Sequence, residues 1–265
     1  MRAGVGSFAF GWATAHASPP FDEQGLLAFA RRHAVPVVQI ADNIPVHTWP
    51  SERLDRLVAE AARARVAIEL GARGLTSEHL GRYVDLCRRC GARLLRFVAD
   101  ADAYQPSPDD LITVLRETIP ALSAAGLTVA LENHDRFPAT SLRHIIDSVA
   151  SPYVGICLDT ANSLGAGEGL REILDTLTPV TVNMHVKDVR IARLPHMMGF
   201  TVEGRPLGEG QLPIAEAIAE VRRHGRCRNV ILEAWTPPAP TIAETIERER
   251  TSAESSIERL KALLG

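Results

Sequence analysis

The chain has 265 residues, of which 46% are hydrophobic and 23% are charged, and its formal net charge is −3. This composition is typical of a globular protein with a sizeable core. Charges of both signs are spread along the chain, so no basic stripe points to nucleic acid or an anionic membrane. No apolar run approaches the ~18 residues of a membrane span, and the start MRAGVGSFAFGW does not resemble a signal peptide. We therefore expect a cytoplasmic protein that binds neither nucleic acid nor a membrane.

Short runs rich in Val, Ile and Leu recur along the chain, each followed by a polar cluster and a longer helical pattern. The runs are near-continuous in apolar residues, as expected of parallel strands that are covered on both faces. The predicted strands cover 3–10, 35–41, 66–71, 93–99, 127–133, 154–159, 180–186 and 229–234.

Helical patterns lie between these strands, for example over 51–65 and 108–126, and a last helix is predicted over 241–264. Eight alternations of strand and helix give ~33 residues per unit, which is the size of a βα unit in a closed barrel. An open doubly wound sheet is the alternative, but GVGSFAFGW lacks the Gly-rich spacing of its phosphate loop. The sequence therefore predicts a single (β/α)₈ TIM barrel domain over 1–265, with its active site at the C-terminal ends of the strands.

Cys87 and Cys90 form a C-x-x-C pair in YVDLCRRCGAR. Half of a zinc site or a redox pair is one interpretation. No second pair completes four metal ligands, and the segment has a helical pattern. We expect free cysteines on a helix.

Four chemically distinctive residues stand at the ends of consecutive predicted strands. Glu132, Asp159, His185 and Glu233 occur in VALEN, GICLD, NMHVKD and VILEAW. Buried carboxylates are rare unless they are paired or bound to a cation. Each residue alone could cap a helix or pair with an arginine, but three carboxylates at neighbouring strand ends would repel one another without a counterion. With one imidazole they form an oxygen-rich set that suits Mn²⁺, Mg²⁺, Co²⁺ or Zn²⁺.

The runs ALENH, CLDTAN, MHVKD and LE occur in this order, and GEGQLP follows the HVKD run. Together these runs resemble the xylose isomerase-like TIM barrel superfamily of sugar phosphate isomerases and epimerases. The resemblance covers most of the chain. It implies a barrel with one divalent metal ion, Mn²⁺ before Mg²⁺, Co²⁺ or Zn²⁺, and it implies Glu132, Asp159, His185 and Glu233 as the metal ligands.

The superfamily includes ketose 3-epimerases, hydroxypyruvate isomerase, inosose dehydratase, sugar-acid decarboxylases and an endonuclease branch. The epimerase branch often has His where Asn162 stands in this chain, which departs from that pattern. The endonuclease branch uses more His ligands than this chain offers.

The predicted chemistry is proton transfer next to a carbonyl, through an enediolate whose charge a divalent cation stabilises. Glu132 and Glu233 could flank the substrate and act as base and acid. The first hypothesis is a metal-dependent isomerase or epimerase that acts on a small ketose or related sugar. The alternative is a metal-dependent lyase, a decarboxylase or dehydratase, acting on an oxo sugar acid. A non-catalytic sugar- or metal-binding barrel is a third hypothesis, because a fold alone does not decide function.

Several further residues are candidate substrate-binding groups. Lys187 lies two residues after the strand-end histidine and would share its face if the strand continues. Arginines at a barrel mouth suit an anionic group, although pairing with surface carboxylates is the other interpretation. The predicted substrate-binding residues are Lys187, Asn162, Arg96, Arg73 and Arg205.

The segment 189–210 is long for a βα loop, which usually has ~2–6 residues. Long loops at the active face are often lids. Met197, Met198 and Phe200 could close over a sugar or sugar-acid substrate, with Arg205 reaching it. Alternatively they pack against another subunit, so a homo-oligomer is left open.

Overall fold

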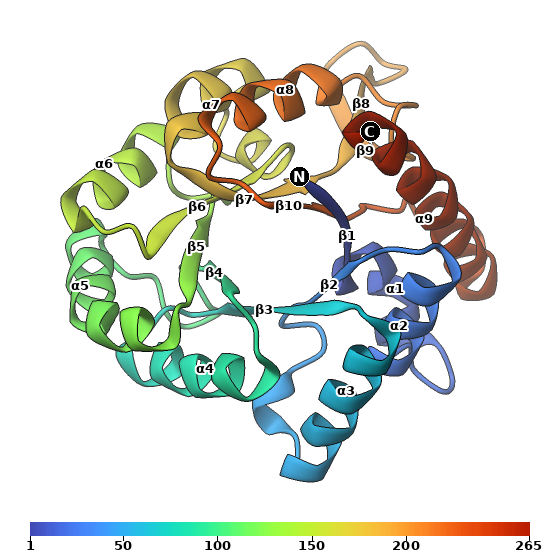
Figure 1. Cartoon of the computed structure of the whole chain (residues 1–265). Coiled ribbons are helices and arrows are strands. Elements are labelled where there is room, and N and C mark those ends of the chain that lie inside the picture. Colours follow the sequence, from blue (N-terminus) through green and yellow to red (C-terminus); the bar gives the residue numbers. More distant parts are fainter.

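The computed structural model describes residues 1–265, and its eight parallel strands close into a barrel. Each strand pairs with its neighbours in chain order, and the last one pairs with the first. A ring of helices surrounds the strands (Figure 1). The predicted (β/α)₈ barrel is confirmed. The barrel strands are β1 (Arg2–Gly6), β2 (Val37–Ile40), β3 (Ala67–Arg73), β4 (Leu94–Val98), β5 (Thr128–Glu132), β6 (Val154–Asp159), β7 (Thr181–Val186) and β10 (Asn229–Leu232).

Capping residues mark both ends of helix α5 (Pro108–Ala125). Ser107 and Asp110 form a capping box at its start, and Gly126 ends it in the left-handed conformation, at φ 60°. None of the helices combines the length and apolar character that crossing a membrane requires. The helices are α1 (Gly11–His16), α2 (Glu23–Arg32), α3 (Ser51–Ala64), α4 (Ser77–Cys90), α5 (Pro108–Ala125), α6 (Ala139–Val149), α7 (Leu170–Leu177), α8 (Ile214–His224) and α9 (Ile242–Leu264).

The predicted helices over 51–65, 108–126 and 241–264 correspond to α3, α5 and α9. Cys87 and Cys90 lie on α4 as free thiols, so the helical interpretation of their segment is confirmed.

The first predicted strand, over 3–10, is too long. The strand ends at Gly6, and Ser7–Phe10 forms the short 3-10 helix η1. The run is apolar beyond the strand because Phe10 turns into the helical layer, where its ring lies 4.3 Å from that of Phe21 and 5.0 Å from that of Phe29.

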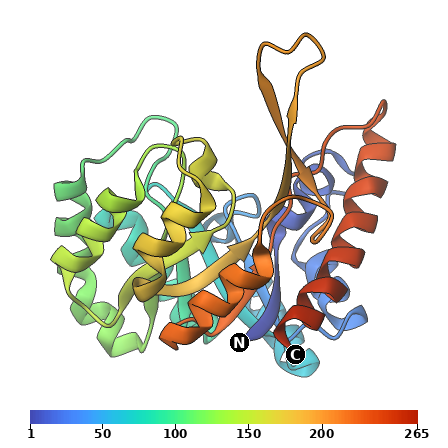
Figure 2. The same ribbon diagram turned by 90° about the horizontal axis from the view of Figure 1, so that it is seen from above.

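The segment 189–210, expected as a loop, is mostly an antiparallel hairpin. Its strands are β8 (Asp188–Arg193) and β9 (Phe200–Arg205), and we call residues 188–205 the arm. The arm stands out from the barrel at the end opposite the two termini (Figure 2). The alternation in VRIAR and FTVEGR is a strand signal that the expectation of a loop overlooked.

The main hydrophobic core lies between the barrel sheet and the surrounding helices. The barrel interior is different, because it holds buried polar side chains such as Glu69, Asn183 and Asn229. Glu69 on β3 hydrogen-bonds to Asn183 on β7 and to Asn229 on β10, neither of which is a neighbour of β3. These contacts therefore cross the barrel interior, where Val, Ile and Leu usually dominate.

Candidate metal centre

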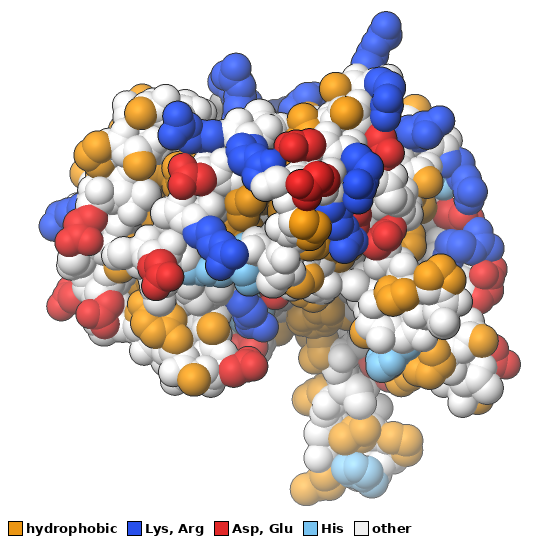
Figure 3. Space-filling view, turned by 90° about the horizontal axis from the view of Figure 1, so that it is seen from below, with side chains coloured by type: hydrophobic (Ala, Val, Ile, Leu, Met, Phe, Trp, Pro, Cys, Tyr) orange, Lys and Arg blue, Asp and Glu red, His pale blue; other side chains and the backbone are white.

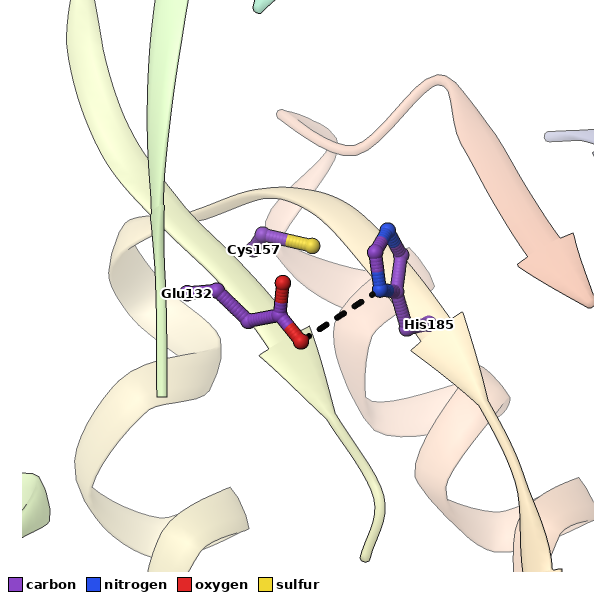
Figure 4. Close-up of side chains that lie close together, drawn as sticks. All are labelled: Glu132, Cys157 and His185. Atoms are coloured by element: carbon purple, nitrogen blue, oxygen red, sulfur yellow. Dashed lines mark ion pairs between the residues drawn. The ribbon is translucent and has the colours of Figure 1, made fainter. Parts of the chain in front are cut away.

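Glu132, Asp159, His185 and Glu233 come together at the C-terminal ends of their strands. Glu132 and Asp159 are the last residues of β5 and β6, His185 lies in β7, and Glu233 directly follows β10. All four are buried. One ligand atom from each lies within 4.8 Å of the others. The carboxylate of Glu132 points towards the imidazole of His185 (Figure 4).

Two buried atoms in this cluster have no hydrogen-bond partner, Nδ1 of His185 and Oε1 of Glu233. Nδ1 lies 3.4 Å from Glu233 Oε1, 3.6 Å from Glu132 Oε1 and 3.9 Å from Asp159 Oδ2. An unsatisfied buried polar atom costs ~1–3 kcal/mol. A cation among these atoms would satisfy both of them, so the residues fit a metal ion.

Two basic side chains approach the same carboxylates. Nζ of Lys187 lies 2.6 Å from Asp159 Oδ2 and 3.0 Å from Glu233 Oε2. Arg96 donates through Nε to Glu132 and through Nη1 to Asp42, the latter at 2.9 Å. Asp42 and the three carboxylates of the cluster thus face Lys187 and Arg96, so when His185 is neutral, as a metal ligand must be, the excess of two negative charges is the charge that a divalent ion would balance.

These ion pairs keep the glutamates of the cluster ionised. Burial alone raises the pKa of Glu132, but Arg96 and His185 outweigh it and lower that pKa to about 2. Burial also raises the pKa of Glu233, and His185 and Lys187 outweigh it, so this pKa falls well below its usual range. Metal ligands must be deprotonated, and both glutamates meet that condition at neutral pH.

Cys157 is a further neighbour of Glu132 and His185 (Figure 4). Burial raises the pKa of its thiol to about 12. The side chain is therefore a thiol at neutral pH, and its Sγ donates to Asn183 Oδ1 at 3.4 Å. Since thiolates rather than thiols ligate metals, the oxygen-rich set remains the candidate ligand set.

Asn162 links the two sides of the cluster. Its Nδ2 donates to Glu132 Oε1 at 2.8 Å, and its Oδ1 accepts from Lys187 Nζ at 3.2 Å. Asp159 Oδ1 accepts from the backbone N–H groups of Ala161 and Asn162, both at 2.8 Å, which leaves Oδ2 directed at the cluster.

A cavity of about 250 Å³ opens at the cluster. Glu132 and Glu233 line it, together with four of the five predicted substrate-binding residues, Lys187, Asn162, Arg96 and Arg73. The apolar part of the wall includes Phe8 and Trp235.

Arg205, the fifth predicted substrate-binding residue, does not line the cavity, because it lies on the arm and pairs with Glu203 at 2.9 Å. Met197, Met198 and Phe200 do not line it either, so the expected lid does not cover the cavity in this structure. The sequence analysis expected these residues near the site because long loops at the active face are often lids. The hairpin geometry carries its tip away from the barrel instead (Figure 2).

The chain matches the profile of the xylose isomerase-like TIM barrel family over residues 2–263. It belongs to this family. The resemblance read from the sequence motifs is thereby confirmed.

The chain is 29% identical to a 3-oxo-isoapionate decarboxylase from Pectobacterium atrosepticum, over 98% of this chain and 95% of that protein. Among solved structures, it is similar to a xylose isomerase-like TIM barrel protein from Mycobacterium smegmatis in complex with magnesium, at 14% identity and a TM-score of 0.73, covering 100% of this chain and 98% of that one. It is also similar to D-psicose 3-epimerase from Clostridium cellulolyticum, solved with D-tagatose, at 14% identity and a TM-score of 0.70, covering 99% of this chain and 98% of that one. At this identity the two structural likenesses show the fold alone.

Asp188 has a role that the sequence reasoning missed. Its carboxylate accepts the backbone N–H groups of Gly208, Gly210 and Leu212 at 2.9, 3.0 and 3.2 Å, and so holds the GEGQLP segment against the strand end. A Cβ atom at Gly210 would lie 2.0 Å from Asp188 Oδ1, so the close approach requires glycine. The carboxylate of Asp188 therefore binds the backbone of this segment rather than the ammonium group of Lys187.

Gln39 and Glu69 were also missed, although each interrupts an apolar strand run, in VVQI and AIEL. Both are buried inside the barrel and belong to a hydrogen-bonded network that reaches His185. A polar residue in the middle of a buried strand is a signal that could have found them.

Proposed function

We propose that Glu132, Asp159, His185 and Glu233 hold one divalent metal ion. The two unpartnered buried atoms and the excess of two negative charges support this proposal. The ligand set is oxygen-rich, so Mn²⁺ is the first choice, with Mg²⁺, Co²⁺ and Zn²⁺ as alternatives. When bound, such an ion would act as a Lewis acid towards a substrate oxygen.

For the reaction, we favour the second of the sequence-based hypotheses, a lyase. The proposed reaction is the decarboxylation of an oxo sugar acid. The observation that carries it is Arg73, which lines the cavity while its guanidinium makes neither a hydrogen bond nor an ion pair. Arg96 and Lys187 are instead engaged with the carboxylates of the centre. An unengaged guanidinium at a cavity suits a planar carboxylate, which it can bind through two hydrogen bonds. The full-length similarity to a decarboxylase supports the same reaction class.

In a 3-oxo acid the ketone is two carbons from the carboxylate carbon. When the bond to the carboxylate carbon breaks, CO₂ leaves and the electron pair moves onto the ketone oxygen as an enolate. A proton is then taken up at the carbon that lost CO₂. In this scheme Arg73 orients the carboxylate before the bond breaks. Lys187 also lines the cavity, and in this scheme its ammonium group would supply that proton.

An isomerase or epimerase acting on a small ketose is the second candidate. It is favoured by Glu132 and Glu233, which line one cavity from two different strands and so could act as base and acid. Against it, both oxygens of Glu132 already accept hydrogen bonds, one from Arg96 and the other from Asn162. A carboxylate engaged in this way is a weak base for a C–H proton.

One assay separates the candidates. Protein loaded with Mn²⁺ is incubated in D₂O with a panel of 3-oxo sugar acids and of neutral ketoses, and CO₂ release and deuterium incorporation are both measured. Release of CO₂ supports the lyase. Exchange or epimerisation of a ketose without CO₂ supports the second candidate. Binding of a sugar without any turnover would leave the non-catalytic barrel.

The role of Arg73 is tested by Arg73→Met and Arg73→Lys. A hydrogen bond to a charged group contributes ~1.5–3 kcal/mol, so we expect Arg73→Met to raise KM for the sugar acid by roughly 10–100-fold. Arg73→Lys should recover part of this loss, because it keeps the charge without the planar fork. An unchanged KM in Arg73→Met would contradict the assignment of the carboxylate to this residue.

A further inference from the structure

Below the candidate metal centre, the barrel interior holds a connected set of polar side chains. Gln39, Glu69, Asn183 and Asn229 are 0%, 3%, 0% and 7% exposed. They come from β2, β3, β7 and β10 and hydrogen-bond to one another across the barrel. None of the four belongs to the proposed ligand set, so the hydrogen bonds among them need a separate explanation.

The end of this network nearest the centre is a contact between Gln39 and His185. Nε2 of His185 lies 2.7 Å from Oε1 of Gln39. An amide oxygen only accepts hydrogen bonds, so Nε2 of the imidazole must carry the hydrogen. In the neutral ring Nδ1 then carries the lone pair, and Nδ1 is the atom that faces the three carboxylates.

The orientation of the Gln39 amide is set by its hydrogen bonds to Glu69 and Asn183, on the side away from His185. Its Nε2 donates to Glu69 Oε2 at 3.1 Å and to Asn183 Oδ1 at 3.3 Å, two acceptors that would reject the amide oxygen. Turning the amide over would place oxygen against oxygen on one side and NH₂ against the N–H of His185 on the other. The amide therefore has one satisfied orientation.

Glu69 is the acceptor at which the network ends. Its carboxylate accepts from Gln39, from Asn183 Nδ2 at 3.2 Å and from Asn229 Nδ2. Asn229 in turn accepts from Arg2 Nε at 3.0 Å. All three contacts come from amide NH₂ groups, which only donate, so Glu69 is the acceptor in each and fixes the direction of the hydrogen bonds between itself and His185.

We propose that Gln39 and Glu69 are positioning residues that hold His185 in the Nε2–H form, with the lone pair of Nδ1 directed at the metal. This inference rests on the proposed metal centre and extends it to residues that touch neither metal nor substrate. Partners that orient a metal-bound histidine typically change metal affinity by ~10–100-fold when they are removed. Here the carboxylate acts through an interposed glutamine rather than directly on the imidazole.

Metal affinity is the first measurement. Calorimetric titration with Mn²⁺ compares the wild type with Gln39→Leu, which keeps the volume but removes the acceptor. We expect the dissociation constant to rise by ~10–100-fold in Gln39→Leu. The double variant Gln39→Glu with Glu69→Gln is the rescue. It keeps the total charge and again offers an oxygen to Nε2–H, so its affinity should return to within a few-fold of the wild type.

The tautomer is the second measurement, and it is made on the wild type, so it does not depend on how the variants fold. Nitrogen-15 NMR of the Zn²⁺-loaded protein should show His185 protonated at Nε2 and metal-bound at Nδ1. Circular dichroism checks that each variant is folded.

The outcomes separate this inference from the metal centre itself. A folded Gln39→Leu variant with wild-type affinity, or a hydrogen on Nδ1, would overturn the positioning role while leaving the centre intact. A wild type that binds neither Mn²⁺ nor Zn²⁺ would overturn both. Loss of metal affinity in Gln39→Leu and its return in the double variant would support the positioning role of Gln39 and Glu69.

Discussion

At the scale of single residues, Glu132 shows how the site balances burial against charge. The carboxylate is fully enclosed, yet it accepts from Arg96 on one oxygen and from Asn162 on the other. Burying an unpaired carboxylate would cost far more than any single hydrogen bond returns. Arg96 therefore offsets the cost of burying the Glu132 carboxylate at this strand end.

This pairing predicts a pH dependence for the metal-free protein. The pKa of Glu132 is lowered to about 2 in the folded state from its usual 4.5. Because the folded pKa is the lower one, the stabilisation is fully present above pH 4.5 and is lost as the pH falls from there towards 2. We expect the wild type to lose more unfolding free energy over this window than Glu132→Gln, which has no group to protonate. Urea unfolding of both proteins at a series of pH values measures the difference, and parallel curves would contradict the prediction.

At the scale of elements, the strands were predictable because covered parallel strands are apolar on both faces. The clustering of Glu132, Asp159, His185 and Glu233 was predictable because each is a polar residue at or near the end of such a run. The arm was not predicted, since its turn LPHMMG carries no familiar hairpin signal. Gln39 and Glu69 could be seen as polar residues in strands, but not as partners of His185. Their contacts join residues that are far apart in the chain, and only closure of the barrel brings them together.

The arm contacts the backbone of Trp235 at Gly204, and this contact predicts the effect of a substitution there. A Cβ atom at this position would lie 1.6 Å from the backbone oxygen of Trp235, so no side chain fits without moving the loop. Overpacking of this kind costs ~1–3 kcal/mol. We expect Gly204→Ala to lower thermal stability and to change the fluorescence of Trp235, which lines the cavity.

The matched control for Gly204→Ala is Val202→Ala, two residues earlier on the same strand, where the side chain is 45% exposed. It should leave both readouts close to those of the wild type. Wild-type stability in Gly204→Ala would mean that the arm is not seated against the Trp235 backbone in solution.

At the scale of the whole molecule, the arm presents apolar side chains to solvent. Met197, Met198 and Phe200 are 62%, 83% and 59% exposed, and hydrophobic side chains gather on the projecting tip (Figure 3). Exposed apolar patches often mark contacts with another protein, so of the two sequence-based roles for this segment the subunit contact is the one to test. We expect light scattering to report a homo-oligomer whose mass falls in the double variant Met198→Ser and Phe200→Ser. A monomeric wild type would contradict this expectation.

Metal binding should stabilise the entire barrel, because the four proposed ligands belong to β5, β6, β7 and the residue after β10. An ion that binds only the folded state adds about 2.7 kcal/mol at a hundredfold excess over its dissociation constant. For a chain of this length that corresponds to a rise of roughly 5–10 °C in Tm. We expect Mn²⁺ to raise Tm by this amount and a chelator to reverse it. Mass spectrometry of the native protein should find one ion per chain.

Asp159→Asn should lose both the bound ion and the rise in Tm. Asp135→Asn is the matched control, since Asp135 lines the same cavity but does not belong to the cluster. It should keep both. If Asp159→Asn retained the ion while Asp135→Asn lost it, the ion would sit at the cavity rim, and the buried carboxylates would have only Arg96, Lys187 and His185 as positively charged partners.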